Sequence, residues 1–160
     1  MPVILLTQSQ VALVDEADYD RLMQWKWYAR YSKSTHTFYA LRGIKTAGSM
    51  TSVLMSRDIL GLGKGDKRLA EHANRDTLDN RRKNLRIATR SQNGANRGLN
   101  KNNASGFKGV RLYKDRGQWE AGVRVNGQMK HLGFFATPEE AYEVYKAAML
   151  ELFGEFARVP

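Results

Sequence analysis

The chain has 160 residues, with 26 Lys and Arg against 16 Asp and Glu, so its formal net charge is +10 and its pI is near 10.0. The length allows one ordinary domain or two small ones, and 42% hydrophobic residues indicate a folded chain rather than a disordered basic tail. The lack of Cys excludes disulfides, thiolate zinc sites, iron–sulfur clusters and cysteine nucleophiles. No apolar run approaches the roughly 20 residues that span a bilayer, and the start MPVILLTQSQ has no basic region, so we expect a cytoplasmic protein.

The excess positive charge is concentrated in the middle of the chain. Residues 67–103 carry +7, whereas residues 1–66 carry +2 and residues 104–160 carry +1. The last segment divides again, into +4 over residues 104–137 and −3 over residues 138–160. Such a balance indicates a polyanionic partner, either nucleic acid or an anionic membrane surface, although a merely soluble basic protein stays open.

The first third of the chain predicts a mixed α and β leader. A short β-prone run covers Val11 to Val14, and Asp15 to Trp25 is typical of a helix with acidic residues in its first turn. Thr37 to Ile44 and Thr51 to Met55 are expected as strands around a turn at Gly48. We place the end of this leader at the glycines 61, 63 and 65.

The middle segment predicts the order strand, loop, strand, helix. The strands are expected over Arg68 to His72 and Leu85 to Ala88, with a polar loop from residue 74 to residue 84 between them. Thr89 and Gln92 fit a capping box, and Gly98 is expected to end the helix that follows. Residues 99–106 have the composition of a linker.

The last third predicts a three-stranded antiparallel sheet packed on one helix. Strands are expected over Phe107 to Leu112, Trp119 to Val125 and Met129 to Phe135, and Asn126-Gly127 is a strong hairpin signal. Thr137 is expected to cap a helix that runs to about Phe153. We expect Phe134, Phe135, Tyr145 and Phe153 to form the core between sheet and helix.

One face of this sheet would be left open by the helix and is expected to be basic. Arg111, Arg116, Arg124 and Lys130 can line up there, and a β-sheet can enter the major groove of DNA. A solvated polar face without a ligand is the alternative.

Four residues of the middle segment suggest a chemical site: Glu71, His72, Asn84 and Asn93. A carboxylate and an amide oxygen can together hold Mg²⁺, and a neutral His beside them can act as a base for water. A purely structural role for a His beside a Glu remains open from spacing alone.

Two long runs resemble known families. The run EHANRDTLDNRRKNLRIATRSQNGANRG resembles the ββα-metal (His-Me finger) site of HNH endonucleases, in the His-Asn-Asn variety of phage and homing nucleases. The run SGFKGVRLYKDRGQWEAGVRVNGQMKHLGFFATPEEAYEVYKAAMLELFGEFA resembles the DNA-binding domain named for the plant Apetala and ethylene-response factors (ERF). Together they resemble free-standing HNH proteins of phages and bacteria, so the cell would be bacterial or phage-infected.

The resemblance implies a role for each site residue. His72 would be the general base that activates water, Glu71 and Asn93 would bind Mg²⁺ or Mn²⁺, and Asn84 would tie the loop together. The residues expected to contact DNA are Arg81, Arg82, Arg86, Lys108, Arg111, Arg116, Trp119, Arg124 and Lys130.

Two departures from the family pattern bear on catalysis. Glu71 stands where the family has Asp, and Ser56 stands where relatives often have His. The alternative function is therefore a catalytically decayed HNH protein that binds DNA as a regulator, and binding to RNA or an anionic membrane is a third reading.

The sequence as a whole predicts an α+β protein. Residues 1–98 would form a β-rich leader and an HNH nuclease module with its core at 67–98, and residues 107–160 an ERF-type domain after the linker. The expected partner is double-stranded DNA, with no membrane and no small-molecule cofactor, and the chain would act as a monomer or a homodimer.

Overall fold

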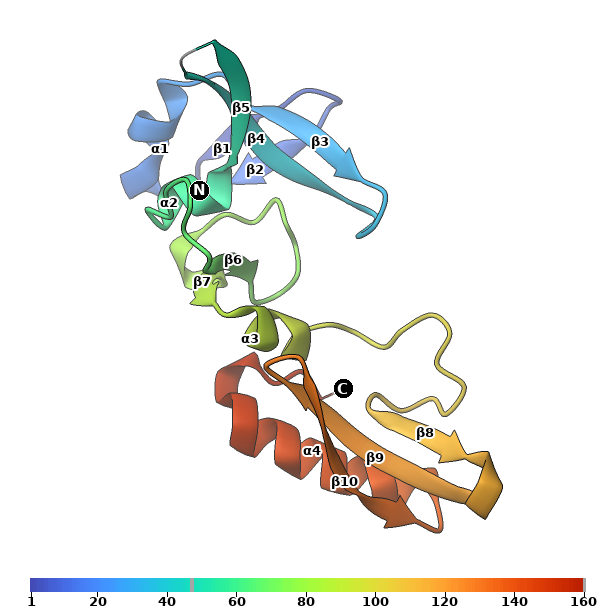
Figure 1. Ribbon diagram of the computed structural model, residues 1–160. Helices are drawn as coiled ribbons and strands as arrows, with labels where there is room; N and C mark the ends of the chain where they lie inside the picture. The colour runs from blue at the N-terminus through green and yellow to red at the C-terminus, as the bar shows by residue number, and fades with distance from the viewer. Residues whose placement is uncertain (47, 160) are drawn as a thin grey trace. The chain divides into compact units, whose positions relative to one another are not determined.

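The computed structural model describes residues 1–46 and 48–159. The backbone falls into two compact units, Met1–Ala88 and Thr89–Pro160, each of which is described by itself. Both units combine helices with small antiparallel sheets (Figure 1), which agrees with the expected α+β class.

The first unit consists of short strands and helices, drawn from blue to green in Figure 1. Its antiparallel sheets pair β1 with β2, β6 with β7, and β3, β4 and β5 in that order. In chain order the elements are β1 (Val3–Leu5), β2 (Val11–Leu13), α1 (Glu16–Met23), β3 (Tyr28–Ser32), β4 (Thr37–Thr46), β5 (Ser49–Leu54), α2 (Met55–Ile59), β6 (Leu69–His72), a 3₁₀ turn (Arg82–Asn84) and β7 (Leu85–Ala88).

One apolar core joins the leader to the strand pair β6–β7. Ile4 of β1, Leu22 of α1 and Met55 of α2 are buried in the same cluster as Leu85 of β7. Trp27 closes this cluster, and its indole Nε1 donates a hydrogen bond to the Leu22 carbonyl at 2.8 Å. A strand pair of four residues each cannot bury a core of its own, so β6 and β7 depend on the leader for their stability.

The polar loop between β6 and β7 is fixed by backbone hydrogen bonds to β2. The Leu13 N–H donates to the Leu78 carbonyl at 2.8 Å, and the Asn80 N–H donates to the Leu13 carbonyl at 2.8 Å. The Thr77 hydroxyl also donates to the Phe38 carbonyl of β4 at 2.5 Å. The leader therefore sets the conformation of this loop.

The second unit places a three-stranded antiparallel sheet, in the order β10-β9-β8, against one long helix (Figure 1). Thr137 caps the long helix and the helix ends at Phe153, as expected, and Thr137 forms a capping box with Glu140. The elements are α3 (Arg90–Ala95), β8 (Val110–Tyr113), a 3₁₀ turn (Lys114–Arg116), β9 (Gln118–Val125), β10 (Gln128–Phe135), α4 (Pro138–Phe153) and a final 3₁₀ turn (Gly154–Phe156).

The side of the sheet that α4 covers carries the core of this unit. Ala121 and Val123 of β9 are buried there, together with Tyr145 and Met149 of α4. Gly109 precedes β8 with φ at +74°, and a Cβ at that position would lie 2.1 Å from the Tyr145 ring. Only glycine fits this position, because the ring lies directly against its backbone.

The boundary between the two units differs from the expected positions. We placed boundaries at glycines 61–65 and in the 99–106 linker, whereas the backbone divides after Ala88. Helix α3 belongs to the second unit because its Ser91 hydroxyl accepts from the Asn126 N–H at 3.0 Å, and its Ala95 carbonyl accepts from Lys108 Nζ. The helix also ends at Ala95, before Gly98. The functional division into two domains stays a prediction.

Three elements of the leader were not predicted: β1, β3 and α2. In the sequence of β3, YARYS, apolar and polar residues do not alternate regularly, so no strand pattern is visible. The strand is instead stabilised by its pairing with β4.

Phe134 is also not part of the core beneath α4. A bulge between His131 and Gly133 shifts the register of β10, so Phe134 lies opposite Glu120 on the other side of the sheet.

Candidate functional site

The strand β6 ends with two adjacent buried polar residues, Glu71 and His72. Glu71 is 4% exposed and His72 is 7% exposed. In the antiparallel pair with β7, Glu71 lies opposite Arg86 and His72 lies opposite Leu85. Because neighbouring strand residues point to opposite sides, the two side chains have different surroundings.

A hydrogen bond from the loop defines the protonation of His72. Its Nε2 lies 3.2 Å from Asn80 Oδ1, and Asn80 Nδ2 donates to the Leu78 carbonyl at 3.3 Å. This second bond orients the Asn80 amide so that its oxygen faces the ring, and an amide oxygen can only accept. His72 Nε2 is therefore the protonated nitrogen, and Nδ1 is the nitrogen that can take up a proton.

Burial controls the charge of His72. Desolvation lowers its pKa, and the bond to Asn80 and the charges of Asp76 and Asp79 oppose this effect only in part. The imidazole is therefore neutral at neutral pH, which is the form that a general base requires.

The Glu71 carboxylate has one oxygen in an ion pair and one without a hydrogen-bond partner. Arg86 Nε donates to Glu71 Oε2 at 2.6 Å, while Glu71 Oε1 is buried and makes no hydrogen bond. A buried carboxylate oxygen in this state suits a hard cation such as Mg²⁺. Within the described residues no group of three His, Cys, Asp or Glu gathers around a point, so any such ion would keep several water ligands.

Asn84 connects the two ends of the polar loop. Its Nδ2 donates to the Asp79 carbonyl at 2.7 Å, and its Oδ1 accepts from the Asn74 N–H at 3.0 Å. Asn84 is buried, with 6% of its surface exposed. Its side chain is thus used to hold the loop that carries Asn80, the partner of His72.

Asn93 lies on α3, in the second unit, and its backbone N–H bonds to the Thr89 carbonyl at 3.0 Å. Its side chain is half-buried. The expected pairing of Glu71 with Asn93 on one ion therefore stays a prediction.

The arginines expected to contact phosphates in the first unit are paired with carboxylates. Arg81 Nη2 lies 2.6 Å from Asp79 Oδ2, and Arg82 Nε lies 2.7 Å from Asp18 Oδ2. These bonds lower the pKa of both aspartates. Only Asp18 among the carboxylates that pair with Arg81, Arg82 and Arg86 lies outside residues 67–103. Among these three arginines, Arg82 alone therefore has a partner that the segment's +7 does not already count.

The open side of the C-terminal sheet carries a charged cluster across all three strands. Arg111 Nε of β8 donates to Glu120 Oε2 of β9 at 2.5 Å, and His131 Nδ1 of β10 lies 3.0 Å from Glu120 Oε1. The guanidinium of Arg116 lies over the Phe134 ring, 5.0 Å from its centroid. Arg124 is also exposed, beside the hairpin.

Three residues expected to contact DNA lie elsewhere in the second unit. Lys108 Nζ donates to the Ala95 carbonyl at 2.5 Å and to the Arg158 carbonyl at 3.2 Å, and burial lowers the pKa of Lys108 to about 8. Lys130 lies opposite Val123, whose side chain is buried beneath α4. Trp119 alternates with Ala121 and Val123 and so shares that covered side.

Sequence reasoning missed Asn80 and Glu120. Asn80 is 1% exposed and orients His72, but in the sequence it is one of many polar residues in the loop between the two strands, so no local signal distinguishes it. The signal for Glu120 was that it is the one acidic residue in the predicted strand Trp119 to Val125, on a sheet whose other charged residues were predicted to be basic.

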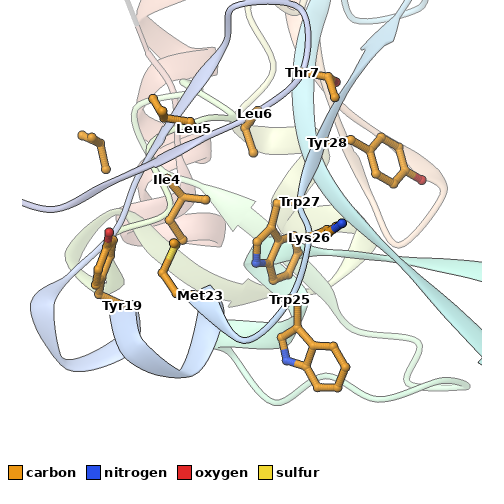
Figure 2. Close-up of a pocket in the computed structure, with 11 residues that line it drawn as sticks. Ile4, Leu5, Leu6, Thr7, Tyr19, Met23, Trp25, Lys26, Trp27 and Tyr28 are labelled. Carbon is orange, nitrogen blue, oxygen red and sulfur yellow. The ribbon is translucent and has the colours of Figure 1, made fainter.

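An apolar hollow of about 580 Å³ lies on the first unit (Figure 2). Ile4 of β1, Tyr19 and Met23 of α1, and Trp25 and Trp27 after it line this hollow. Its lining, among the described residues, includes no carboxylate and no His, unlike the end of β6 with Glu71 and His72.

Comparison with known proteins supports a relationship with HNH endonucleases. An uncharacterized HNH endonuclease of Acanthamoeba polyphaga mimivirus is 37% identical to this chain over 87 residues. The aligned part covers 54% of this chain and 44% of that protein, so the chain spans about half the length of the relative that it matches. No family model and no solved structure matches the chain. Among the described residues, no helix is long and apolar enough to cross a membrane.

Proposed function

We propose that this protein is an HNH-type, metal-dependent endonuclease that hydrolyses phosphodiester bonds of duplex DNA. The observation that carries the proposal is the pair formed by His72, a buried neutral imidazole oriented by Asn80, and Glu71, a buried carboxylate with one unpartnered oxygen. The mimivirus relative supports the same reaction class.

His72 would act as the general base. With Nε2–H donating to Asn80, Nδ1 accepts the proton of a water molecule that attacks the phosphorus. Asn80 then stabilises the imidazolium as well as the neutral ring, because its oxygen accepts from Nε2–H in both forms. The hydrogen bonds of Asn84 hold the loop, so the ring keeps its direction during proton transfer.

Glu71 Oε1 would be one ligand of Mg²⁺ or Mn²⁺, and the resemblance to HNH nucleases implies the amide oxygen of Asn93 as a second ligand. When bound, the ion would supply positive charge to the phosphate and to the leaving 3′ oxygen. Arg86 Nε donates to Oε2, so Oε1 is the oxygen that would bind the ion.

The C-terminal sheet would hold the DNA, as the ERF-type resemblance implies. Its open side presents Arg111, Arg116 and Arg124. Lys108 donates to two backbone carbonyls, and the pairing of Lys130 with Val123 places Lys130 on the side of the sheet that α4 packs against, so we propose these three arginines as the DNA contacts.

A plasmid assay tests the proposal. Supercoiled plasmid incubated with the protein and Mg²⁺ or Mn²⁺ should be nicked, and His72→Ala should lower the rate by at least about a hundredfold. Binding of the same plasmid in EDTA serves as the control for both proteins. A parent protein that binds the plasmid but nicks no faster than His72→Ala would overturn the proposal.

A decayed nuclease that binds DNA as a regulator is the second candidate. The observation in its favour is the ion pair with Arg86, which already neutralises the carboxylate proposed as a metal ligand. Glu71→Asp separates the two candidates. Nicking that appears only in Glu71→Asp would establish decay, whereas nicking by the parent protein would exclude it.

A further inference from the structure

Glu120 lies at the centre of the open side of the C-terminal sheet. It belongs to the middle strand β9, opposite Arg111 on β8 and Phe134 on β10. Each of its carboxylate oxygens has a partner from a different strand: Arg111 Nε on Oε2 at 2.5 Å and His131 Nδ1 on Oε1 at 3.0 Å. The side chain of Glu120 is 12% exposed, while those of Arg111 and His131 are 71% and 47% exposed.

A carboxylate at this position is unfavourable for binding a polyanion. The hydrogen bond from Arg111 lowers the pKa of Glu120, so it stays ionised and its charge opposes that of the surrounding arginines. Stability does not account for it, because exposed ion pairs between neighbouring strands add little and the sheet is already held by its backbone bonds. A role in recognition does account for it.

The surface beside Glu120 is hollowed, so a ligand can approach the strands closely. A pit of about 170 Å³ is lined by Gly109, Arg111, Glu120, Gly122 and Met129, among others. Gly122 has no side chain in this pit, and a Cβ there would come within 3.1 Å of the Met129 sulfur. Arg111 and Glu120 therefore line a pit into which we expect the edge of a base to fit.

The chemistry of this pair selects one kind of base pair. A carboxylate only accepts hydrogen bonds, and the donors on base edges in the major groove are the amino groups of cytosine and adenine. Arg111 uses Nε for Glu120, and the guanidinium has four further N–H groups on its two Nη atoms. Guanine offers two adjacent acceptors to such a group, whereas thymine offers one.

We propose that Glu120 and Arg111 together read one C·G base pair in duplex DNA, with Glu120 accepting from the cytosine amino group and Arg111 donating to the guanine. This inference rests on the proposed binding of DNA by the C-terminal sheet. Glu120 is then a specificity-determining residue, which lowers the affinity for DNA in general and raises the discrimination at one position.

Selection from a random duplex library tests the inference. The full-length protein, Glu120→Gln and the control Glu151→Gln are used in EDTA, so that no DNA is cut. Glu151 is exposed on α4, so its replacement makes the same change of charge on the helix that covers the other side of the sheet. The bound fractions are sequenced, and affinity for a random duplex is measured by fluorescence anisotropy.

The parent protein and Glu151→Gln should enrich a C·G pair at one position. Glu120→Gln should lose roughly 5- to 150-fold of that discrimination, while its affinity for random duplex should rise roughly fivefold. A reduced affinity together with a lowered melting temperature would show a structural role and would overturn the inference. Unchanged base preference in Glu120→Gln would overturn it as well, while leaving the proposed nuclease function intact.

The parent protein's own behaviour separates the two proposals. A parent protein that binds no duplex would overturn DNA binding by the sheet, and the inference with it. A parent protein that binds duplex but prefers no C·G pair at any position would overturn the inference alone.

Discussion

Arg86 and Glu71 form a buried ion pair across the two strands of the candidate active site, with Nε 2.6 Å from Oε2. The side chains are 17% and 3% exposed, so water screens this pair poorly. Glu71 therefore has two roles: its Oε2 stabilises the fold through Arg86, and its Oε1 would bind the metal ion in the proposed reaction.

Arg86→Met should destabilise the first unit by about 3 kcal/mol, because it leaves a buried carboxylate without its cation. The double variant Glu71→Gln, Arg86→Met should be more stable than Arg86→Met, since no charge is then left buried. Urea denaturation followed by tryptophan fluorescence measures both free energies of unfolding. A double variant as unstable as Arg86→Met would mean that Arg86 acts through other contacts.

Asn80→Ala should reduce nicking about 10- to 100-fold while DNA binding is unchanged. The variant leaves the Nε2–H of His72 without its acceptor, and the ring loses the bond that orients it. Initial rates of plasmid nicking, compared with affinity measured in EDTA, check this result. A reduced affinity with a normal nicking rate would place Asn80 in DNA binding instead.

The pKa of His72 gives a stability profile with a defined sign. Burial lowers the pKa in the folded protein, so below about pH 6.5 the unfolded chain binds more protons than the folded one. Stability should therefore fall as the pH drops from 7 to 5. His72→Gln should show a shallower decrease in urea denaturation at several pH values, because Gln takes up no proton when the chain unfolds. Equal slopes in both proteins would contradict the neutral state of His72.

Local features of this protein could be predicted from the sequence, whereas contacts between distant residues could not. The capping box at Thr89 and the helix cap at Thr137 were predicted because each is a local signal within four residues. The contact between His72 and Asn80 was not, since it depends on a loop held by Leu13, more than sixty residues earlier in the chain. A local pattern carries no information on such a contact.

The faces of the C-terminal sheet illustrate a second limit. The Asn126-Gly127 turn pairs Val125 with Gln128, and this register alone places Lys130 opposite Val123. That step was available from the sequence and would have placed Lys130 on the side of the sheet opposite to Arg111 and Arg124, whereas its contact with DNA stays a prediction. The bulge at His131 was not available in this way, although Gly133, with φ at +145°, is the residue that permits it.

Lys108 and Arg124 should respond differently to substitution, although both are basic residues of the same unit. Lys108→Met removes two hydrogen bonds to carbonyls, so it should lower stability by about 1–3 kcal/mol and leave the affinity for duplex DNA unchanged. Arg124→Ala should weaken binding and reduce by about 1 the slope of log affinity against log salt concentration. Anisotropy titrations between about 50 and 200 mM salt measure these slopes. A slope that falls for Lys108→Met and not for Arg124→Ala would place the DNA at Lys108 instead of the open side of the sheet, because only a charge near phosphate releases counterions from the DNA.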